Sequence, residues 1–179
     1  MDERVLVTYA SIMGATTGIA RAIGIELRAS GAAVRVLPIE HVSSLEDYRS
    51  VIVGSPIYEG SWLESAVTFL EQYRDLLSKI PVAYFVVYAK THQSDDQQQL
   101  RTQHSINAVL ERLPEIKPVD IGRFTGAFNS RRWTLPTLLA LKASGELPLD
   151  GDYRDWEAIR AWAIKVLPLL NSQTAAAHS

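Results

Sequence analysis

A turn of small and hydroxyl-bearing residues lies between the first apolar run of the chain and a helical pattern. Its sequence is Ser11-Ile12-Met13-Gly14-Ala15-Thr16. Backbone N–H groups at the start of a helix, together with two hydroxyls, can surround a phosphate, and the helix dipole adds positive potential. The turn holds no Lys or Arg and no G-x-G-x-x-G spacing, so it is neither a nucleotide P-loop nor a dinucleotide-binding motif. It suits one phosphate monoester; the alternative is a helix start whose Ser and Thr satisfy their own backbone.

Two further loops could form walls around that turn. The first runs Gly54-Ser55-Pro56-Ile57-Tyr58-Glu59-Gly60-Ser61-Trp62, and the second runs Tyr88-Ala89-Lys90-Thr91-His92. In the first loop, Tyr58 and Trp62 offer aromatic faces for stacking, and the backbone can meet the edge of a heterocycle. Aromatic residues in loops also pack against their own domain, and this alternative stays open. No His and no pair of adjacent carboxylates has a convincing partner in the sequence, so we expect neither a catalytic side chain nor a metal site.

The composition limits the class of protein. The chain has 179 residues, of which 47% are hydrophobic and 21% are charged, as in a single globular domain. Lys and Arg number 18 against 20 Asp and Glu, so no general attraction to nucleic acid is expected. Cysteine is absent, which excludes disulfides, thiolate metal centres and a Cys nucleophile. Any redox chemistry therefore needs a bound cofactor.

The elements that must position these loops alternate between buried strands and amphipathic helices. We expect strands at residues 5–9, 34–37, 51–55 and 82–88, and an interrupted strand through Val119, Ile121, Phe124 and Phe128. We expect helices at residues 16–30 with Gly31 as C-cap, at 63–78, after the polar stretch 91–99 with Leu100, Ile106, Val109 and Leu113, and after a cap at Asp152 or Asp155. Such alternation predicts a parallel sheet with helices on both faces, whose ligands bind beyond the carboxyl ends of the strands.

At the first turn and the first wall loop, the chain resembles the flavodoxin-like family. The matching residues are 5–9, the turn 11–16 at the family's Ser/Thr-x-Thr-Gly-x-Thr phosphate loop, and residues 51–58 at its flavin-ring loop. The resemblance implies a doubly wound, five-stranded parallel sheet in a three-layer α/β/α sandwich, with FMN as cofactor. It implies phosphate contacts at Ser11, Gly14, Ala15 and Thr16, ring contacts at Ser55, Pro56, Ile57, Tyr58, Gly60 and Tyr88, and a cofactor site completed by Ile12, Met13, Ala89 and Lys90. Met13 and Ala15 stand where the family often has hydroxyl or amide side chains.

Within that family the chain is most similar to the menaquinone-dependent protoporphyrinogen dehydrogenases. The likeness covers nearly the whole chain and includes residues 128–133 and 152–157. It implies that electrons pass from a tetrapyrrole precursor through bound FMN to a quinone, with no side chain required as acid or base. The residues expected on the substrate side are Trp62, Arg131, Arg132 and Trp133.

The segment after the fifth strand, residues 129–151, is longer than a crossover needs. A Leu-rich stretch flanked by Pro136 and Pro148 predicts a short helix, and its apolar residues are Leu135, Leu138, Leu139 and Leu141. The apolar side of this helix could contact a quinone, a lipid surface or a second copy of the chain in a homo-oligomer. The simpler alternative is that the helix packs on its own domain.

We expect one flavodoxin-like domain over residues 1–171 and a flexible tail over residues 172–179. No apolar stretch reaches the ~18 residues that suggest a membrane span. The start of the chain also lacks the pattern of a signal peptide. A cytoplasmic protein is therefore expected, with peripheral membrane contact left open.

Three functions remain open. The leading one is an FMN-dependent oxidoreductase that passes electrons between a small-molecule donor and acceptor. The second is a flavodoxin-type electron carrier, against which the near-neutral charge argues because carriers steer their partners with charged patches. The third is a flavodoxin-like interaction domain without a cofactor, which Met13 and Ala15 would allow.

Overall fold

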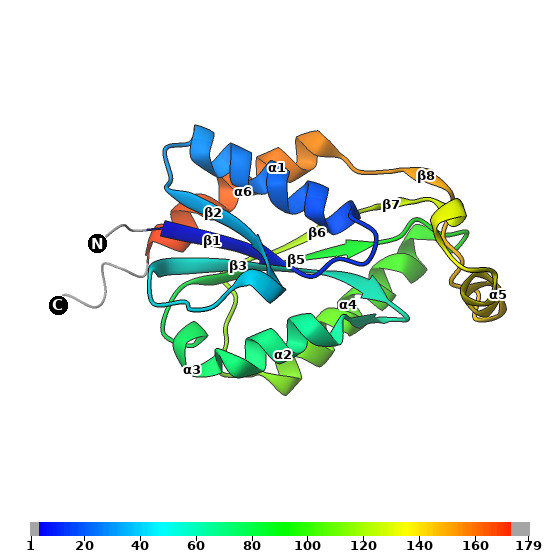
Figure 1. Ribbon diagram of the computed structural model, residues 1–179, viewed down its shortest axis with the longest axis horizontal. Coiled ribbons are helices and arrows are strands. Elements are labelled where there is room, and N and C mark those ends of the chain that lie inside the picture. The colour runs from blue at the N-terminus through cyan, green and yellow to red at the C-terminus, as the bar shows by residue number, and fades with distance from the viewer. Residues whose placement is uncertain (1–3, 173–179) are drawn as a thin grey trace.

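A parallel β-sheet forms the middle layer of the structure, a computed structural model that describes residues 4–172 (Figure 1). Its five parallel strands lie in the order β2 (Val34–Pro38), β1 (Arg4–Tyr9), β3 (Tyr48–Tyr58), β5 (Val82–Tyr88) and β6 (Ile121–Thr125). A short strand, β4 (Ser61–Trp62), folds back antiparallel on β3. This order confirms the expected doubly wound α/β fold.

Helices cover both faces of the sheet. α1 (Ala15–Ala29) and α6 (Trp156–Asn171) lie on one face, and α2 (Glu64–Gln72), α3 (Arg74–Leu77) and α4 (Asp95–Arg112) lie on the other (Figure 1). Buried side chains form two apolar clusters, one between the sheet and each helical layer. The central strands are covered on both faces, which explains why their sequences are continuous apolar runs without alternation.

The ends of two helices follow the signals in the sequence. After α1, Gly31 adopts a φ of 90°, and the N–H of Ala32 donates to the carbonyl of Leu27 at 3.0 Å. Gly31 therefore ends the helix as expected, although the C-cap residue is Ser30 and Gly31 is the left-handed residue that follows it. The side chain of Asp155 caps α6 by accepting from the N–H of Ala158 at 2.9 Å. Asp152, the other expected cap, binds Arg154 instead.

Two helices on the other face differ from their expected form. The single helix expected at residues 63–78 is divided at Tyr73, where the backbone leaves helical values, so α2 and α3 are separate. α4 begins inside the stretch 91–99, because the side chains of Ser94 and Gln97 form a capping box that needs no apolar residue. Leu100, expected on the apolar side of α4, is 72% exposed and lies outside the core.

β3 is longer than expected and ends in a hairpin. It continues past Ser55 to Tyr58, and the chain turns into β4 at Glu59 and Gly60. Both turn residues have positive φ, of 50° and 76°, as tight β-hairpins require. The hairpin fixes which side chains of this loop face the carboxyl end of the sheet.

The fifth parallel strand is interrupted as expected. β6 ends at Thr125, and β7 (Ala127–Phe128) pairs antiparallel with β8 (Gly151–Asp152) in a separate two-stranded ribbon. Between β7 and β8 the chain forms a 3-10 turn (Ser130–Arg132) and the helix α5 (Leu135–Ala143). α5 lies at the end of the molecule opposite the two termini, beyond the carboxyl ends of the strands (Figure 1).

Residues 173–179 of the expected flexible tail lie outside the part of the chain that the structure describes. Within residues 4–172, no helix combines the length and the apolar character that crossing a membrane requires.

Candidate functional site

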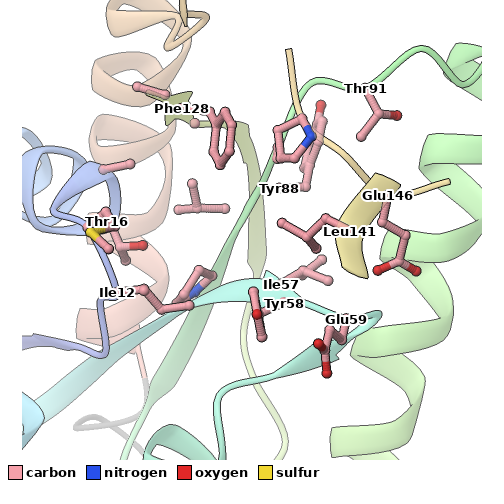
Figure 2. A pocket seen from close by; sticks show the side chains of 18 of the residues that line it. Ile12, Thr16, Ile57, Tyr58, Glu59, Tyr88, Thr91, Phe128, Leu141 and Glu146 are labelled. Atoms are coloured by element: carbon pink, nitrogen blue, oxygen red, sulfur yellow. The ribbon is translucent and has the colours of Figure 1, made fainter. Parts of the chain in front are cut away.

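A pocket opens beyond the carboxyl ends of β1, β3 and β5, where the three expected loops meet (Figure 2). Thr16, which is buried, comes from the first turn of α1, Tyr58 from the end of β3, and Tyr88 from the end of β5. Residues of α4 and of the 129–151 segment form the remaining side. Doubly wound sheets bind their ligands at this position.

The turn after β1 leaves the start of α1 open to an anion. Gly14 is the N-cap residue, with a φ of 91°, and no side chain caps the first helical turn. The hydroxyl of Ser11 accepts from the N–H of Gly14 at 3.0 Å, so part of the turn satisfies itself. The first helical turn contains no acidic residue. Because the first N–H groups of a helix have no intrahelical acceptor, these groups and the helix dipole favour an anionic ligand.

A cation reaches this turn from a distant part of the sequence. Arg132 donates from Nη1 to the carbonyl oxygen of Met13 at 3.1 Å, and 119 residues separate the two partners. The turn itself contains no Lys or Arg. Arg131 and Arg132 both line a second hollow, between this turn and residues 128–133, and neither lines the main pocket.

The hairpin after β3 brings Tyr58 to the pocket and places Trp62 in the core. Trp62 is 5% exposed and packs edge-on against Tyr84, with ring centroids 5.2 Å apart. Its expected substrate-side position is therefore wrong, because pairing with β3 turns the ring into the sheet's apolar cluster. Ser55 is fully buried and accepts from the N–H of Leu63 at 3.0 Å. It holds the hairpin and does not line the pocket.

Four aromatic side chains line the pocket: Tyr58, Tyr88, Phe128 and Trp133. The ring planes of Tyr58 and Trp133 lie within 16° of parallel, with their centroids 6.0 Å apart. Trp133 also packs against Phe128, at a centroid distance of 5.6 Å. Nearly parallel aromatic faces suit a flat heterocycle, which stacks on them with an offset.

The wall after β5 includes two polar residues, Thr91 and Gln98, that were not expected as ligand contacts. Ala89 lines the pocket as expected, whereas Lys90 is not part of the lining and its Nζ binds Asp95 at 3.1 Å. Thr91 is buried and lines the pocket, and its hydroxyl donates to Oε1 of Gln98 at 3.2 Å. Both side chains bring to this wall polar atoms that a ligand edge could meet.

Residues of the 129–151 segment close the pocket beside α4 (Figure 2). Leu141 of α5 is 6% exposed and lines the cavity. Glu146, which follows α5, also lines it and forms an ion pair with Arg101 of α4. The N–H of Leu149 donates to the carbonyl of Lys90 at 2.7 Å. No local pattern in the sequence predicts these contacts, because the partners belong to different elements far apart in the chain.

A carboxylate ties the two ends of the same segment together. Asp150 accepts from the backbone N–H of Ser130 at 2.5 Å and from its hydroxyl at 2.7 Å. The backbone bond and then the hydroxyl bond hold the pKa of Asp150 below its ordinary value, and the charge of Arg131 adds to the effect. Asp150 therefore holds the two ends of the 129–151 segment next to each other.

α5 is only partly packed on its own domain. Leu141 is buried, whereas Leu135 and Leu139 are 68% and 57% exposed. Packing on the domain thus accounts for one side of the predicted Leu-rich helix, and two leucines remain at the surface.

The family described as Flavodoxin domain matches residues 6–137, which is most of the chain. Among curated protein sequences, none matches significantly.

Solved structures share the fold. Oxidised flavodoxin 1 from Bacillus cereus has a TM-score of 0.57 at 14% identity, over 92% of this chain and 97% of that one. Oxidised flavodoxin 2 from the same organism has a TM-score of 0.53 at 18% identity, over 93% and 99% of the two chains. The rubredoxin oxygen:oxidoreductase from Desulfovibrio gigas has a TM-score of 0.57 at 16% identity; 97% of this chain matches only 37% of that one. At these identities the likeness concerns the fold alone.

Proposed function

Because the chain belongs to the flavodoxin family, whose cofactor is FMN, we propose that it is an FMN-dependent oxidoreductase with its flavin in the pocket described above. The bound cofactor would supply one- or two-electron transfer. The chain's own residues hold the phosphate, support the ring and limit the access of water.

The turn after β1 fits the phosphate of FMN. It offers the uncapped N–H groups at the start of α1, a helix start without an acidic residue, and the hydroxyl of Thr16 at the pocket wall. Met13 and Ala15 bring no polar side chain to this turn, but the backbone N–H groups do not depend on side-chain type. This set of donors has no anionic partner within the turn, and the phosphate of FMN would supply one.

The aromatic wall fits the flavin ring. Tyr58, Tyr88 and Trp133 supply aromatic faces, and Thr91 and Gln98 supply polar atoms among apolar neighbours. A few placed polar groups within an apolar and aromatic lining are typical of cofactor pockets. The donor set of the pocket therefore agrees with a group that is anionic at one end and flat at the other.

The 129–151 segment is the observation that favours an enzyme over a carrier. An electron carrier must bring a partner protein close to its flavin, which needs an open approach. Here Trp133, Leu141 and Glu146 line the pocket from this segment, and the ion pair with Arg101 fixes it to α4. The 129–151 segment thus covers the pocket. Segments that cover a pocket in this way serve reactions of small molecules, because they sequester the site from water.

We further propose that the small molecules are a reduced tetrapyrrole as electron donor and a quinone as acceptor, in line with the sequence resemblance. The apolar and aromatic lining of the pocket supports a hydrophobic substrate. The exposed Leu135 and Leu139 supply apolar surface on the same helix whose Leu141 lines the pocket. A quinone could use that surface as it approaches.

An electron carrier is the second candidate, and the match of residues 6–137 to the family described as Flavodoxin domain favours it. Anaerobic turnover of the FMN-loaded protein distinguishes the two. We expect protoporphyrinogen to reduce the bound flavin. A soluble quinone analogue should then reoxidise the flavin. Fast electron exchange with a reduced ferredoxin, without turnover of either small molecule, would instead support the carrier. If the protein failed to bind FMN, the candidate that remained would be an interaction domain without a cofactor.

A further inference from the structure

Three arginines and two carboxylates surround the second hollow beside the turn after β1. They are Arg131, Arg132, Arg154, Asp150 and Asp152. Arg154 and Asp152 form an ion pair, whereas Arg131 acts on Asp150 through its charge alone. Arg154 binds Asp152 from Nε at 2.8 Å and from Nη2 at 2.5 Å. The charge of Arg131 helps to keep Asp150 ionised, by lowering its pKa together with the bonds from Ser130.

Arg132 is the unmatched charge. Among residues 4–172, no carboxylate lies within ion-pair distance of its guanidinium, and Nη1 donates to the carbonyl of Met13. That bond uses one of the five N–H donors of an arginine. The remaining donors and the full positive charge stay beside the uncapped start of α1.

We propose that Arg132 binds the phosphate of FMN and supplies the cation that the turn after β1 lacks. This inference rests on the proposed function and adds a residue that no pattern in the turn predicts. A guanidinium forms strong, charge-assisted hydrogen bonds with phosphate oxygens and fits them two at a time. It would also offset the missing side-chain donors at Met13 and Ala15.

The position of Arg132 couples the phosphate to the cover of the pocket. Arg132 precedes Trp133, which lines the pocket against Tyr58, and it belongs to the segment that continues to Leu141 and Glu146. A phosphate held by both α1 and Arg132 therefore ties this segment to the cofactor. FMN should order the 129–151 segment more than riboflavin, which has the same ring and no phosphate.

The test compares the affinities of FMN and riboflavin, by flavin fluorescence titration, in the unaltered protein and in two variants. We expect Arg132→Ala to weaken FMN binding by about tenfold or more, since it removes a hydrogen bond to a charged group, and to leave riboflavin binding unchanged. Arg131→Ala is the matched control from the same 3-10 turn, and we expect it to change FMN affinity by less than about threefold, because its charge acts on Asp150 and it is Arg132 that bonds to the turn after β1. Added salt should weaken FMN binding to the unaltered protein more than to Arg132→Ala.

Amide hydrogen exchange gives a second readout that does not depend on turnover. FMN should protect residues 129–151 in the unaltered protein, and riboflavin or the Arg132→Ala variant should show less protection there. Equal losses of FMN and riboflavin affinity in Arg132→Ala would overturn the inference, since Arg132 would then act only by shaping the turn. Unchanged FMN affinity would overturn it too. A failure of the unaltered protein to bind FMN would overturn the proposed function itself.

Discussion

Arg101 of α4 and Glu146, the residue shortly after α5, form an ion pair in the wall of the pocket. Their side chains are 37% and 20% exposed, so solvent screens the pair only in part. The pair joins the 129–151 segment to α4, a helix that packs on the sheet. It thereby holds the pocket in its covered form.

Breaking this pair should loosen the cover. We expect Arg101→Ala and Glu146→Ala each to raise the rate of FMN dissociation, by an amount corresponding to about 0.5 to 1 kcal/mol for a partly exposed pair. Stopped-flow release into excess apoflavodoxin measures this rate. The double variant should be no faster than the faster single variant, because the interaction is lost once. Fully additive effects would mean that the ion pair does not fasten the cover.

Gly14 should matter for both stability and binding. Its φ of 91° lies in the left-handed region, so Gly14→Ala should cost about 1 to 2 kcal/mol of folding free energy. The same substitution distorts the start of α1 and should weaken FMN binding. Gly31→Ala is a matched control, because Gly31 has a φ of 90° at the other end of the helix. Urea unfolding and FMN titration should show a stability loss in both variants and a binding loss only in Gly14→Ala.

Tyr58 and Trp133 should quench the fluorescence of bound flavin. We expect Tyr58→Ala and Trp133→Ala each to restore part of the fluorescence and to cost on the order of 1 kcal/mol of binding free energy, as expected for aromatic stacking. Trp62→Phe should destabilise the fold and leave flavin fluorescence unchanged, because Trp62 lies in the core. If Trp62→Phe alone altered the fluorescence, the assignment of the ring wall would be wrong.

Asp150 should make the 129–151 segment sensitive to acid. Its pKa is held down in the folded protein by the N–H and the hydroxyl of Ser130, with burial opposing. A lowered folded pKa stabilises the fold fully above the unfolded carboxyl pKa of about 4, and the gain is lost as the pH falls through the folded value. The protection of the segment against hydrogen exchange, relative to the intrinsic exchange rate at each pH, should therefore decrease as the pH falls below about 4. In Asp150→Asn this pH dependence should be weaker, and an identical dependence would assign it to another group.

Strands, the first turn and the aromatic loop are predictable from the sequence because their signals are local. A buried run, a Gly-containing turn and an amphipathic period place the pocket at the carboxyl ends of β1, β3 and β5. Local sequence does not indicate that Trp133 lies at the pocket and Trp62 does not. Their positions depend on a hairpin register that buries Trp62 and on a segment that returns Trp133 to Tyr58.

The long-range contacts could not be predicted for a related reason. Nothing near Met13 indicates that Arg132 will bind its carbonyl, and nothing near Arg101 indicates Glu146. Helix boundaries set by polar caps are also hard to predict from apolar spacing, as the N-cap of α4 at Ser94 shows. Local sequence patterns thus predict the fold and the loops after β1, β3 and β5. The contacts made by the 129–151 segment depend on tertiary packing.

The most direct test of the central claim is a titration of the purified, flavin-free protein with FMN and, in parallel, with riboflavin, followed by visible absorbance and fluorescence. The account predicts one FMN bound per chain, quenched fluorescence, and much weaker binding of riboflavin, since the start of α1 binds the phosphate. Absence of FMN binding, or equal affinity for the two flavins, would contradict it.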